Sequence, residues 1–506
     1  MHLPPAPEIA VRRLPARFGL LALLAGTLVA TFGATSAAEG PAPPLDFSDC
    51  RLESPAGIGA IAARCGALTV PENPAAPGGR QITLHVAVVP ALNRRAQPDP
   101  LFVLAGGPGQ AATDFYAAYA GAFSAIGRDR DIVLVDQRGT GKSAPLMCDY
   151  PEDPEAPTVG PEQLKRATLE CLRRLDHDPR YYTTTVAVGD LDAVRRALGV
   201  QQVNLYGVSY GTRVAQHYLR RFPQHVRTVV LDGAVPPQIL LGPDMALDAQ
   251  HSLDAILARC KQDTACNERF PDAAAEFKSL QQRLKTPVQL TFPDPATGKP
   301  QTLDFGAEHL GGVVRLLSYS DGTAALLPLL IHSAQAENNL APLAAQYLLI
   351  EQSIESQFAY GMHNAVVCTE DLPLINRRQV DAGALAATYL GTASLDGLSA
   401  LCSVWPAGVL DPDLHHPLRS DTPVLILSGS NDPITPVRYG EQVLAQFTKG
   451  RHLVVEGYGH GQLASPCVPG LLARFINLGD IRGLDTRCVA GLKAAPFLLD
   501  FTGPAP

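Results

Sequence analysis

The chain has 506 residues, of which 46% are hydrophobic and 18% are charged, and its formal net charge is −8. This balance is typical of a globular protein and excludes a disordered or fibrous chain. The acidic balance also argues against nucleic acid as a partner, because phosphate backbones are bound mainly by Lys and Arg. A chain of this length exceeds what one hydrophobic core usually sustains, so we expect either one large domain carrying an insertion or two domains.

The N-terminal residues 1–38 have the three-part pattern of a secretory signal. Three arginines precede an apolar run from about residue 18 to residue 32, and small residues follow as far as Ala38. A transmembrane anchor is the alternative, but the run is nearer to about fifteen residues than to the roughly twenty that span a bilayer. We therefore expect an exported protein, periplasmic or extracellular, with no stable membrane anchor after cleavage.

All ten cysteines follow the predicted signal. An even number of cysteines in an oxidising compartment predicts disulfides. Metal ligation is the alternative, but the sequence has no C-x-x-C pair and no His at ligand spacing from a Cys, so we expect no metal and no cofactor. Sequence alone does not fix the connectivity. We expect nearest neighbours along the chain to pair, because this closes five short loops: Cys50–Cys65, Cys148–Cys171, Cys260–Cys266, Cys368–Cys402 and Cys467–Cys488.

Short apolar runs rich in Val, Ile and Leu recur along the chain. Strands covered on both faces need continuous apolar sequence, so these runs are predicted to be buried parallel strands. The runs are Leu101–Leu104, Ile132–Val135, Val203–Tyr206, Thr228–Leu231, Val424–Leu427 and Leu453–Val455. Helical stretches such as Val186–Leu198 and Thr212–Arg221 lie between them. The alternation predicts an α/β fold with a doubly wound, mostly parallel sheet.

Helical, Ala- and Leu-rich sequence interrupts this alternation from about Pro236 to Trp405. We interpret it as an inserted, mainly helical cap domain. The expected organisation is a signal peptide at 1–38, the first part of the core at 39–235, the cap at 236–405 and the C-terminal part of the core at 406–506.

A G-x-S-x-G pattern, from Gly207 to Gly211, follows one predicted strand and directly precedes a predicted helix. The turn from strand to helix is so tight that the residues two positions before and two positions after the serine must lack side chains. The pattern therefore predicts Ser209 as an exposed nucleophile in an α/β-hydrolase fold.

A serine nucleophile needs an imidazole to take its proton and a carboxylate to orient that imidazole. In this fold the chain order is Ser, acid, His. Asp432 and His460 both come just after predicted strands, at the edge where such sheets build their sites. Glu456 is the rival acid, but it is too close in sequence to His460 to lie on a separate loop. We expect Ser209, Asp432 and His460 to form a catalytic triad.

The oxyanion of the tetrahedral intermediate needs two backbone N–H donors. One comes from the residue after the nucleophile, Tyr210, and the other from a glycine-rich loop after an earlier strand. Gly106 to Gly109 form such a loop, and Pro108 within it has no N–H. We expect Gly107 to be the second donor.

Four segments together resemble the prolyl aminopeptidase family of α/β hydrolases, and within it the larger secreted tripeptidyl aminopeptidases. They are AGGPG at Ala105–Gly109, DQRGTGKS at Asp136–Ser143, YGVSYGT at Tyr206–Thr212 and SGSNDPITP at Ser428–Pro436. The smaller prolyl enzymes usually have His before GGPG, where this chain has Ala105, so a strict proline iminopeptidase is disfavoured.

The resemblance implies that peptides with a free N-terminus are the substrates. A desolvated ammonium group needs a carboxylate facing it. Glu370 is the first candidate and Asp371 the second, because they follow Cys368 in a segment similar to one in the tripeptidyl enzymes. The alternative is a solvated acidic turn held by the Cys368 disulfide.

The leading hypothesis is therefore an exported serine aminopeptidase that releases single residues or short N-terminal peptides. A carboxylesterase or lipase is the alternative, because the same triad and oxyanion hole serve esters. A binding module on an inactive hydrolase fold is a third hypothesis, against which the intact triad argues.

Overall fold

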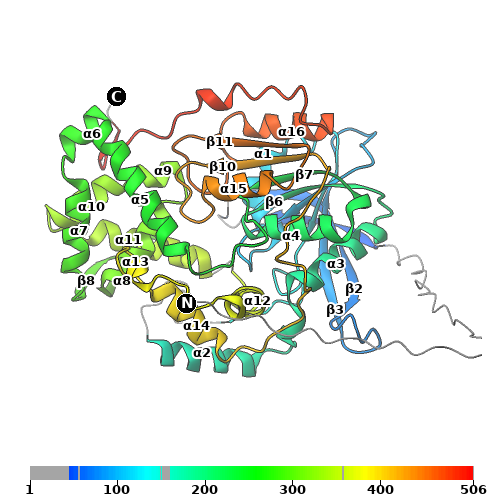
Figure 1. Ribbon diagram of the computed structural model, residues 1–506, viewed down its shortest axis with the longest axis horizontal. Coiled ribbons are helices and arrows are strands. Elements are labelled where there is room, and N and C mark those ends of the chain that lie inside the picture. The colour runs from blue at the N-terminus through cyan, green and yellow to red at the C-terminus, as the bar shows by residue number, and fades with distance from the viewer. Residues whose placement is uncertain are drawn as a thin grey trace, which may run out of the picture. The chain divides into compact units, whose positions relative to one another are not determined.

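The computed structural model describes residues 45–54, 57, 59–148, 150, 160–355 and 358–504. The predicted signal peptide at 1–38 lies outside these residues. Within the described residues a nine-stranded sheet forms the centre of the fold (Figure 1). In order across the sheet its strands are β1 (Phe47–Glu53), β2 (Ala60–Pro71), β3 (Gln81–Val89), β5 (Ile132–Val135), β4 (Leu101–Leu104), β6 (Val203–Val208), β7 (Val226–Asp232), β10 (Val424–Gly429) and β11 (Gly450–Val455).

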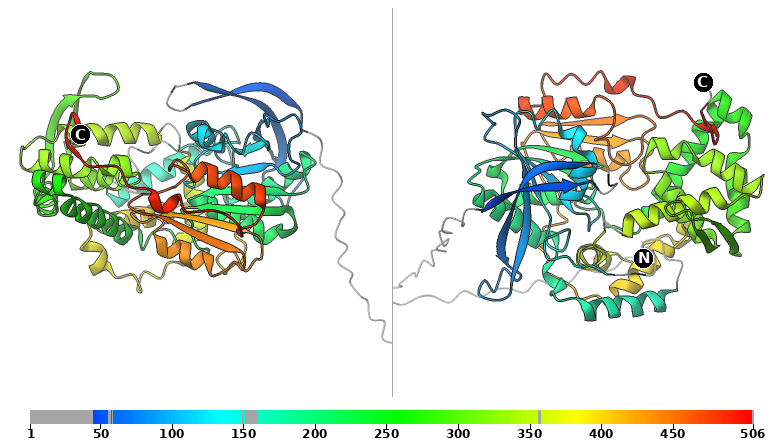
Figure 2. Two further views of the ribbon diagram at one scale, coloured as in Figure 1. Left: turned by 90° about the horizontal axis from the view of Figure 1, so that it is seen from above. Right: turned by 180° about the vertical axis from the view of Figure 1, so that it is seen from behind.

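The sheet is mixed. Strands β1, β2, β3 and β5 pair antiparallel, and every pair from β5 to β11 is parallel. The long strands β1 and β2, coloured blue, extend past the parallel strands (Figure 2). All six runs predicted to be parallel strands are strands of this sheet, which confirms the α/β-hydrolase fold class.

Side chains of the short parallel strands point alternately into two buried clusters. In β4, Leu101 and Val103 belong to one cluster and Phe102 and Leu104 to the other. Helices α1 (Ala112–Phe123) and α16 (Val468–Leu478) pack into the first cluster. The second is covered by α2 (Pro161–Arg174), α3 (Thr184–Ala197), α4 (Tyr210–Arg221) and α15 (Val437–Leu444). Because helices cover both faces, β4 and β5 are apolar at every position, while β6 and β7 also bury the polar residues Asn204 and Thr228.

Helices dominate the chain between β7 and β10, and Figure 1 shows most of them gathered beside the sheet. They are α5 (Met245–Gln262), α6 (Thr264–Arg269), α7 (Ala273–Arg283), α8 (Ala307–Leu317), α9 (Asp321–Ala324), α10 (Leu327–Gln335), α11 (Ala341–Glu355), α12 (Tyr360–Val366), α13 (Ala382–Ala386) and α14 (Ala393–Cys402). A π-helical turn, Val367–Asp371, follows α12. Much of this segment shares a hydrophobic core of its own, which includes Leu253, Phe277 and Val314.

Two features of this region were not predicted. Strands β8 (Val288–Pro293) and β9 (Pro300–Phe305) form an antiparallel hairpin within the helical segment. The C-terminal segment, drawn in red, runs from α16 to the helices (Figure 1) and ends in β12 (Leu498–Asp500) and β13 (Gly503–Pro504). Phe497 is buried in the core of the helical segment, where the Arg259 guanidinium lies 3.9 Å from the centre of its ring. The described residues near the C-terminus, such as Phe497 and Leu498, thus pack against the helices.

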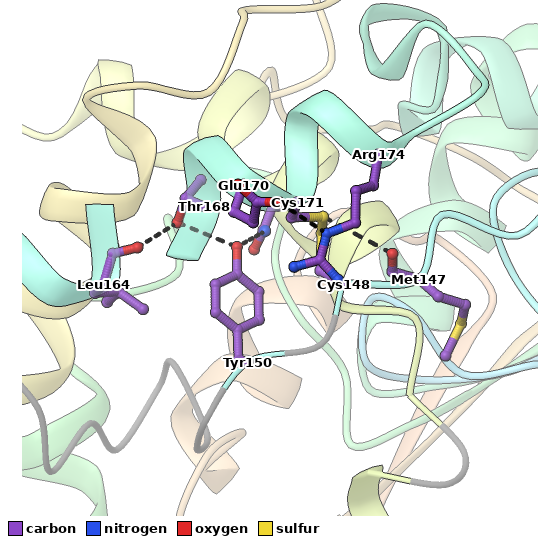
Figure 3. The surroundings of a disulfide bond; sticks show 9 residues. Met147, Cys148, Tyr150, Leu164, Thr168, Glu170, Cys171 and Arg174 are labelled. Atoms are coloured by element: carbon purple, nitrogen blue, oxygen red, sulfur yellow. Dashed lines mark hydrogen bonds and ion pairs between the residues drawn. A yellow bond between two sulfur atoms is a disulfide. The ribbon is translucent and has the colours of Figure 1, made fainter. Parts of the chain in front are cut away.

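Five disulfides join the ten cysteines, and each links nearest neighbours along the chain, as predicted. Figure 3 shows the bond between Cys148 and Cys171, which ties the loop after β5 to α2. Beside it, the Tyr150 hydroxyl lies 3.2 Å from Thr168 Oγ1 and accepts a hydrogen bond from Asn364 Nδ2 at 2.7 Å. Tyr150, two residues after Cys148, thus links α2 to α12 through its hydroxyl group.

We expect the disulfides that close longer loops to stabilise the fold more, with a contribution that grows as the logarithm of the loop length. The bond between Cys368 and Cys402 spans 34 residues and that between Cys260 and Cys266 spans 6. Chain entropy assigns them about 4 and about 2 kcal/mol respectively. Urea unfolding of the two double Cys→Ser variants should give losses of unfolding free energy in that order, and equal losses would contradict the prediction.

Candidate active site

The turn at Ser209 joins β6 to α4 with almost no free space. Ser209 has φ 54° and ψ −124°, a conformation that non-glycine residues rarely adopt. A Cβ atom at Gly207 would lie 2.4 Å from the Gly211 carbonyl oxygen, and one at Gly211 would lie 2.3 Å from that of Leu104. Both positions therefore require glycine, which explains the G-x-S-x-G pattern.

His460 and Asp432 meet on the loops that follow β11 and β10. The Nδ1 atom of His460 lies 2.8 Å from Asp432 Oδ2. The other carboxylate oxygen accepts hydrogen bonds from the N–H groups of Ile434 at 2.9 Å and Thr435 at 2.8 Å. These bonds fix the position of the Asp432 side chain, which in turn orients the imidazole.

Thr435 is a further member of the site that the sequence analysis did not single out. Its hydroxyl donates to Asp432 Oδ2 at 2.7 Å and lies 3.1 Å from His460 Nδ1. Its position three residues after the predicted acid, on the same turn, was the available signal. Thr435 thus contacts both side chains and helps to fix Asp432 and His460 relative to each other.

A residue of the helical segment holds His460 from the other side. The His460 backbone N–H donates to the Tyr319 carbonyl oxygen at 2.7 Å, and the two rings meet edge to face with centres 5.2 Å apart. Tyr319 follows α8, so the helical segment contributes directly to the position of the histidine.

Ser209, His460 and Gly107 line one cavity of about 830 Å³, which lies within the usual range for ligand sites. Its walls come both from the ends of the parallel strands and from the helical segment, which supplies Arg315, Tyr319, Asp321 and Ile350 among others. A second, smaller cavity of about 60 Å³ also has Ser209 and Gly107 in its wall, together with Tyr210 and Asp371. The structure thus gathers the predicted nucleophile, base and oxyanion loop at one place.

The two acidic residues predicted to bind an amine lie differently. Glu370 has no exposed surface and is absent from the residues that line either cavity. Its carboxylate accepts hydrogen bonds from the N–H and the hydroxyl of Thr184 at 2.7 and 2.9 Å, and that hydroxyl lies 2.7 Å from the Tyr210 hydroxyl. Burial raises the pKa of Glu370 to about 7.

Asp371 lines the smaller cavity but is already paired. Its two oxygens accept from Arg213 of α4 at 3.0 and 2.9 Å, and one also accepts from the Leu241 N–H at 2.9 Å. Binding of an amine by Glu370 or Asp371 stays a prediction. In the structure both side chains tie α4, the helix that starts at the nucleophile, to the helical segment.

Comparison with known proteins agrees with this geometry. Residues 99–464 match the profile of the alpha/beta hydrolase fold family, and the chain belongs to that family. The protein is a serine hydrolase.

Three curated relatives cover most of the chain. Serine protease Hip1 of Mycobacterium tuberculosis is 26% identical over 82% of this chain and 85% of its own length. The tripeptidyl aminopeptidase of Streptomyces lividans is 27% identical over 92% of this chain and 90% of its own. Carboxylesterase B of M. tuberculosis is 29% identical over 90% of this chain and 92% of its own length. The resemblance to tripeptidyl aminopeptidases is thus confirmed. A relative named as an esterase is similar to this chain at a comparable sequence identity.

Two negative findings on the described residues concern membrane spans and metal ions. None of their helices combines the length and the apolar composition needed to cross a membrane. Nor do three or more His, Cys, Asp or Glu side chains of this part of the chain gather as a metal ion would require.

We expect Ser209→Ala to lower turnover of any acyl substrate by roughly 10⁶-fold, because the attacking oxygen is removed. The fold should persist, since the Ser209 side chain caps no helix and its N–H bond to the Asp232 carbonyl is retained. Steady-state kinetics together with the melting temperature check this. A variant that keeps wild-type turnover would contradict the assignment of the nucleophile.

The pH dependence should report His460. Burial lowers the pKa of this imidazole, but the neighbouring carboxylates, Asp432 first, outweigh burial and hold the pKa above the ordinary 6.5. A general base must be neutral, so kcat/KM for a soluble ester should fall as the pH drops through a midpoint above 6.5. In Asp432→Asn the midpoint should move down and the rate should fall about 10⁴-fold. A wild-type midpoint well below that of free imidazole would contradict this.

Proposed function

We propose that the protein is an exported serine aminopeptidase that releases short peptides or single residues from free N-termini. Two of the three relatives above are named as peptidases, and one of them as an aminopeptidase acting on tripeptidyl units. The observation that supports the proposal is the composition of the large cavity, which a carboxylate of the helical segment lines together with Ser209 and His460.

In the proposed reaction Ser209 Oγ attacks the scissile carbonyl while His460 takes the hydroxyl proton. The N–H groups of Gly107 and Tyr210 stabilise the negative charge that forms on the carbonyl oxygen. His460 then returns its proton to the departing amine, which leaves the N-terminal fragment as an ester on Ser209. A water molecule, activated by His460, hydrolyses that ester and regenerates the serine.

Asp321 is the carboxylate best placed to meet the substrate ammonium. It lies at the start of α9, lines the large cavity and is partly exposed. Its Oδ2 accepts a hydrogen bond from the Ala495 N–H at 2.9 Å, so the C-terminal segment fixes its orientation. Asp232, the other carboxylate of this cavity, has no exposed surface and both of its oxygens accept hydrogen bonds. This geometry favours Asp321 over Glu370 as the amine-binding residue.

Export is supported by the five disulfides, because such bonds persist mainly outside the reducing cytoplasm. The secretory-signal pattern at residues 1–38 supports export as well. Periplasm and extracellular space are both compatible with these features.

An ester hydrolase is the second candidate. It is favoured by the relative named carboxylesterase B and by an oxyanion hole that would serve esters equally well. The two candidates differ in whether the substrate must carry an ammonium group.

The test compares a peptide anilide that has a free N-terminus with its N-acetylated counterpart. The free peptide should be cleaved at least about a hundred-fold more efficiently, because its ammonium would meet the Asp321 carboxylate, which the acetyl group leaves without a charged partner. Asp321→Asn should raise KM for the free peptide about ten-fold or more and leave the acetylated peptide and a small ester unchanged.

Glu370→Gln is the matched control. It keeps the shape of the side chain but weakens the bonds to Thr184, so it should lower kcat for peptides and esters alike and not raise KM for the free amine selectively. Equal turnover of the free and acetylated peptides would contradict the aminopeptidase proposal and favour the esterase. If Glu370→Gln raised KM selectively for the free-amine peptide, the amine would be bound by Glu370 and not by Asp321.

A further inference from the structure

One buried carboxylate of the catalytic cavity has no part in the reaction described above. Asp232 is the last residue of β7, where it pairs with Val208 of β6 on one side and Leu427 of β10 on the other. It therefore lies at the carboxyl edge of the sheet, between the strand that leads to Ser209 and the strand that leads to Asp432. Its side chain has no exposed surface.

Asp232 makes hydrogen bonds to the segments that carry the nucleophile and the histidine. Its backbone carbonyl accepts from the Ser209 N–H at 2.9 Å. In the side chain, Oδ1 accepts from the N–H of Gln462 at 2.7 Å, two residues after His460. The other oxygen, Oδ2, accepts from the Tyr206 hydroxyl at 2.8 Å. One residue thus fixes the elbow and the histidine loop relative to each other.

The residue that follows Asp232 lies directly against the imidazole. Gly233 has a positive φ of 63°. A Cβ atom there would lie 2.9 Å from Thr435 Oγ1 and 3.0 Å from His460 Cε1. The turn after β7 therefore packs directly against the His460 ring, and the charge of the Asp232 carboxylate acts on that ring.

We infer that Asp232 is a positioning residue for His460, a second carboxylate that holds the histidine loop against Ser209 and stabilises the imidazolium formed during acyl transfer. The inference rests on the roles proposed for Ser209 and His460 and is independent of whether the substrate is a peptide or an ester.

The charges around the pair agree with this role. Burial raises the pKa of Asp232 to about 6, although the hydrogen bonds from Tyr206 and Gln462 favour its anion. The anion in turn adds to the effect of Asp432 in raising the pKa of His460. Other titratable or charged groups also face Asp232 and His460. They are Tyr119 of α1, Tyr206 of β6, Arg315 of α8, Tyr319 after α8 and Asp432 after β10. Asp232 therefore gains a proton just below neutral pH and then ceases to support the imidazolium.

Asp232→Asn tests the charge while keeping the shape, because the amide oxygen can still accept from Gln462. The readout is the second-order rate at which a fluorophosphonate labels Ser209, measured as a function of pH. At its plateau the rate should fall about ten-fold or more, as expected for the loss of one charge near the imidazolium. Without this anion the pKa of His460 drops, so the acid midpoint should move to lower pH.

Two further variants keep the inference falsifiable if Asp232→Asn folds poorly. Tyr206→Phe removes one hydrogen bond that favours the anion, so the pKa of Asp232 should rise. Less of the anion then faces His460, and the acid midpoint should move to lower pH, in the same direction as in Asp232→Asn but by less. Asp99→Asn is the structural control. Asp99 is also buried and pairs with Arg130 at 3.0 Å, but it lies just before β4, at the amino edge of the sheet. It should lower the melting temperature and leave the labelling profile unchanged.

A plateau rate and an acid midpoint that match the wild type in Asp232→Asn would overturn the inference, as would identical profiles for Tyr206→Phe and wild type. If the aminopeptidase proposal fails instead, wild type shows no preference for free amines while the fluorophosphonate still labels Ser209. The two failures are therefore distinguishable.

Discussion

The close approach of α4 to β4 and β6 at Ser209 is the constraint on which the rest of the structure depends. Side chains are excluded at Gly207 and Gly211 by backbone oxygens little more than 2 Å from where a Cβ would lie. The elbow holds Ser209 in an unfavourable backbone conformation, and such strain persists only where the surroundings fix it. The Asp232 carbonyl supplies part of that restraint through its bond to the Ser209 N–H.

The same helix connects the nucleophile to the helical segment. Tyr210, at its first position, reaches Thr184 and through it the buried Glu370, and Arg213 forms an ion pair with Asp371 at 2.9 Å. Because these groups are buried and hydrogen-bonded, removing one partner leaves an unpaired polar group at high cost. The acidic pair therefore joins the two parts of the molecule that form the catalytic cavity.

The sequence predicted what depends on local pattern. Strands covered on both faces are apolar throughout, so β4 and β5 could be located to the residue. The G-x-S-x-G turn follows from sterics, and short loops between neighbouring cysteines made their pairing the simplest choice. The chain order of Ser209, Asp432 and His460 followed from the fold, and the structure adds the 2.8 Å contact between the last two.

The sequence did not predict what depends on distant packing. The sequence left two interpretations of Glu370, an amine-binding residue or a solvated acidic turn, and only the fold shows that it lies against Thr184, 186 residues away. Asp321 and Tyr319 have no local motif, because their position in the cavity depends on how the helical segment meets the sheet. Asp232 likewise reads as the polar end of a strand, and its partner Gln462 lies 230 residues further on.

The central claim is that Ser209 becomes acylated by the N-terminal fragment of a peptide that carries a free amine. Rapid acid quenching during turnover of an unblocked peptide, followed by proteolysis and mass spectrometry, tests it most directly. The account predicts an adduct on Ser209 whose mass equals the N-terminal fragment with its amine free. An adduct on another residue, or one made of an internal or C-terminal fragment, would contradict it.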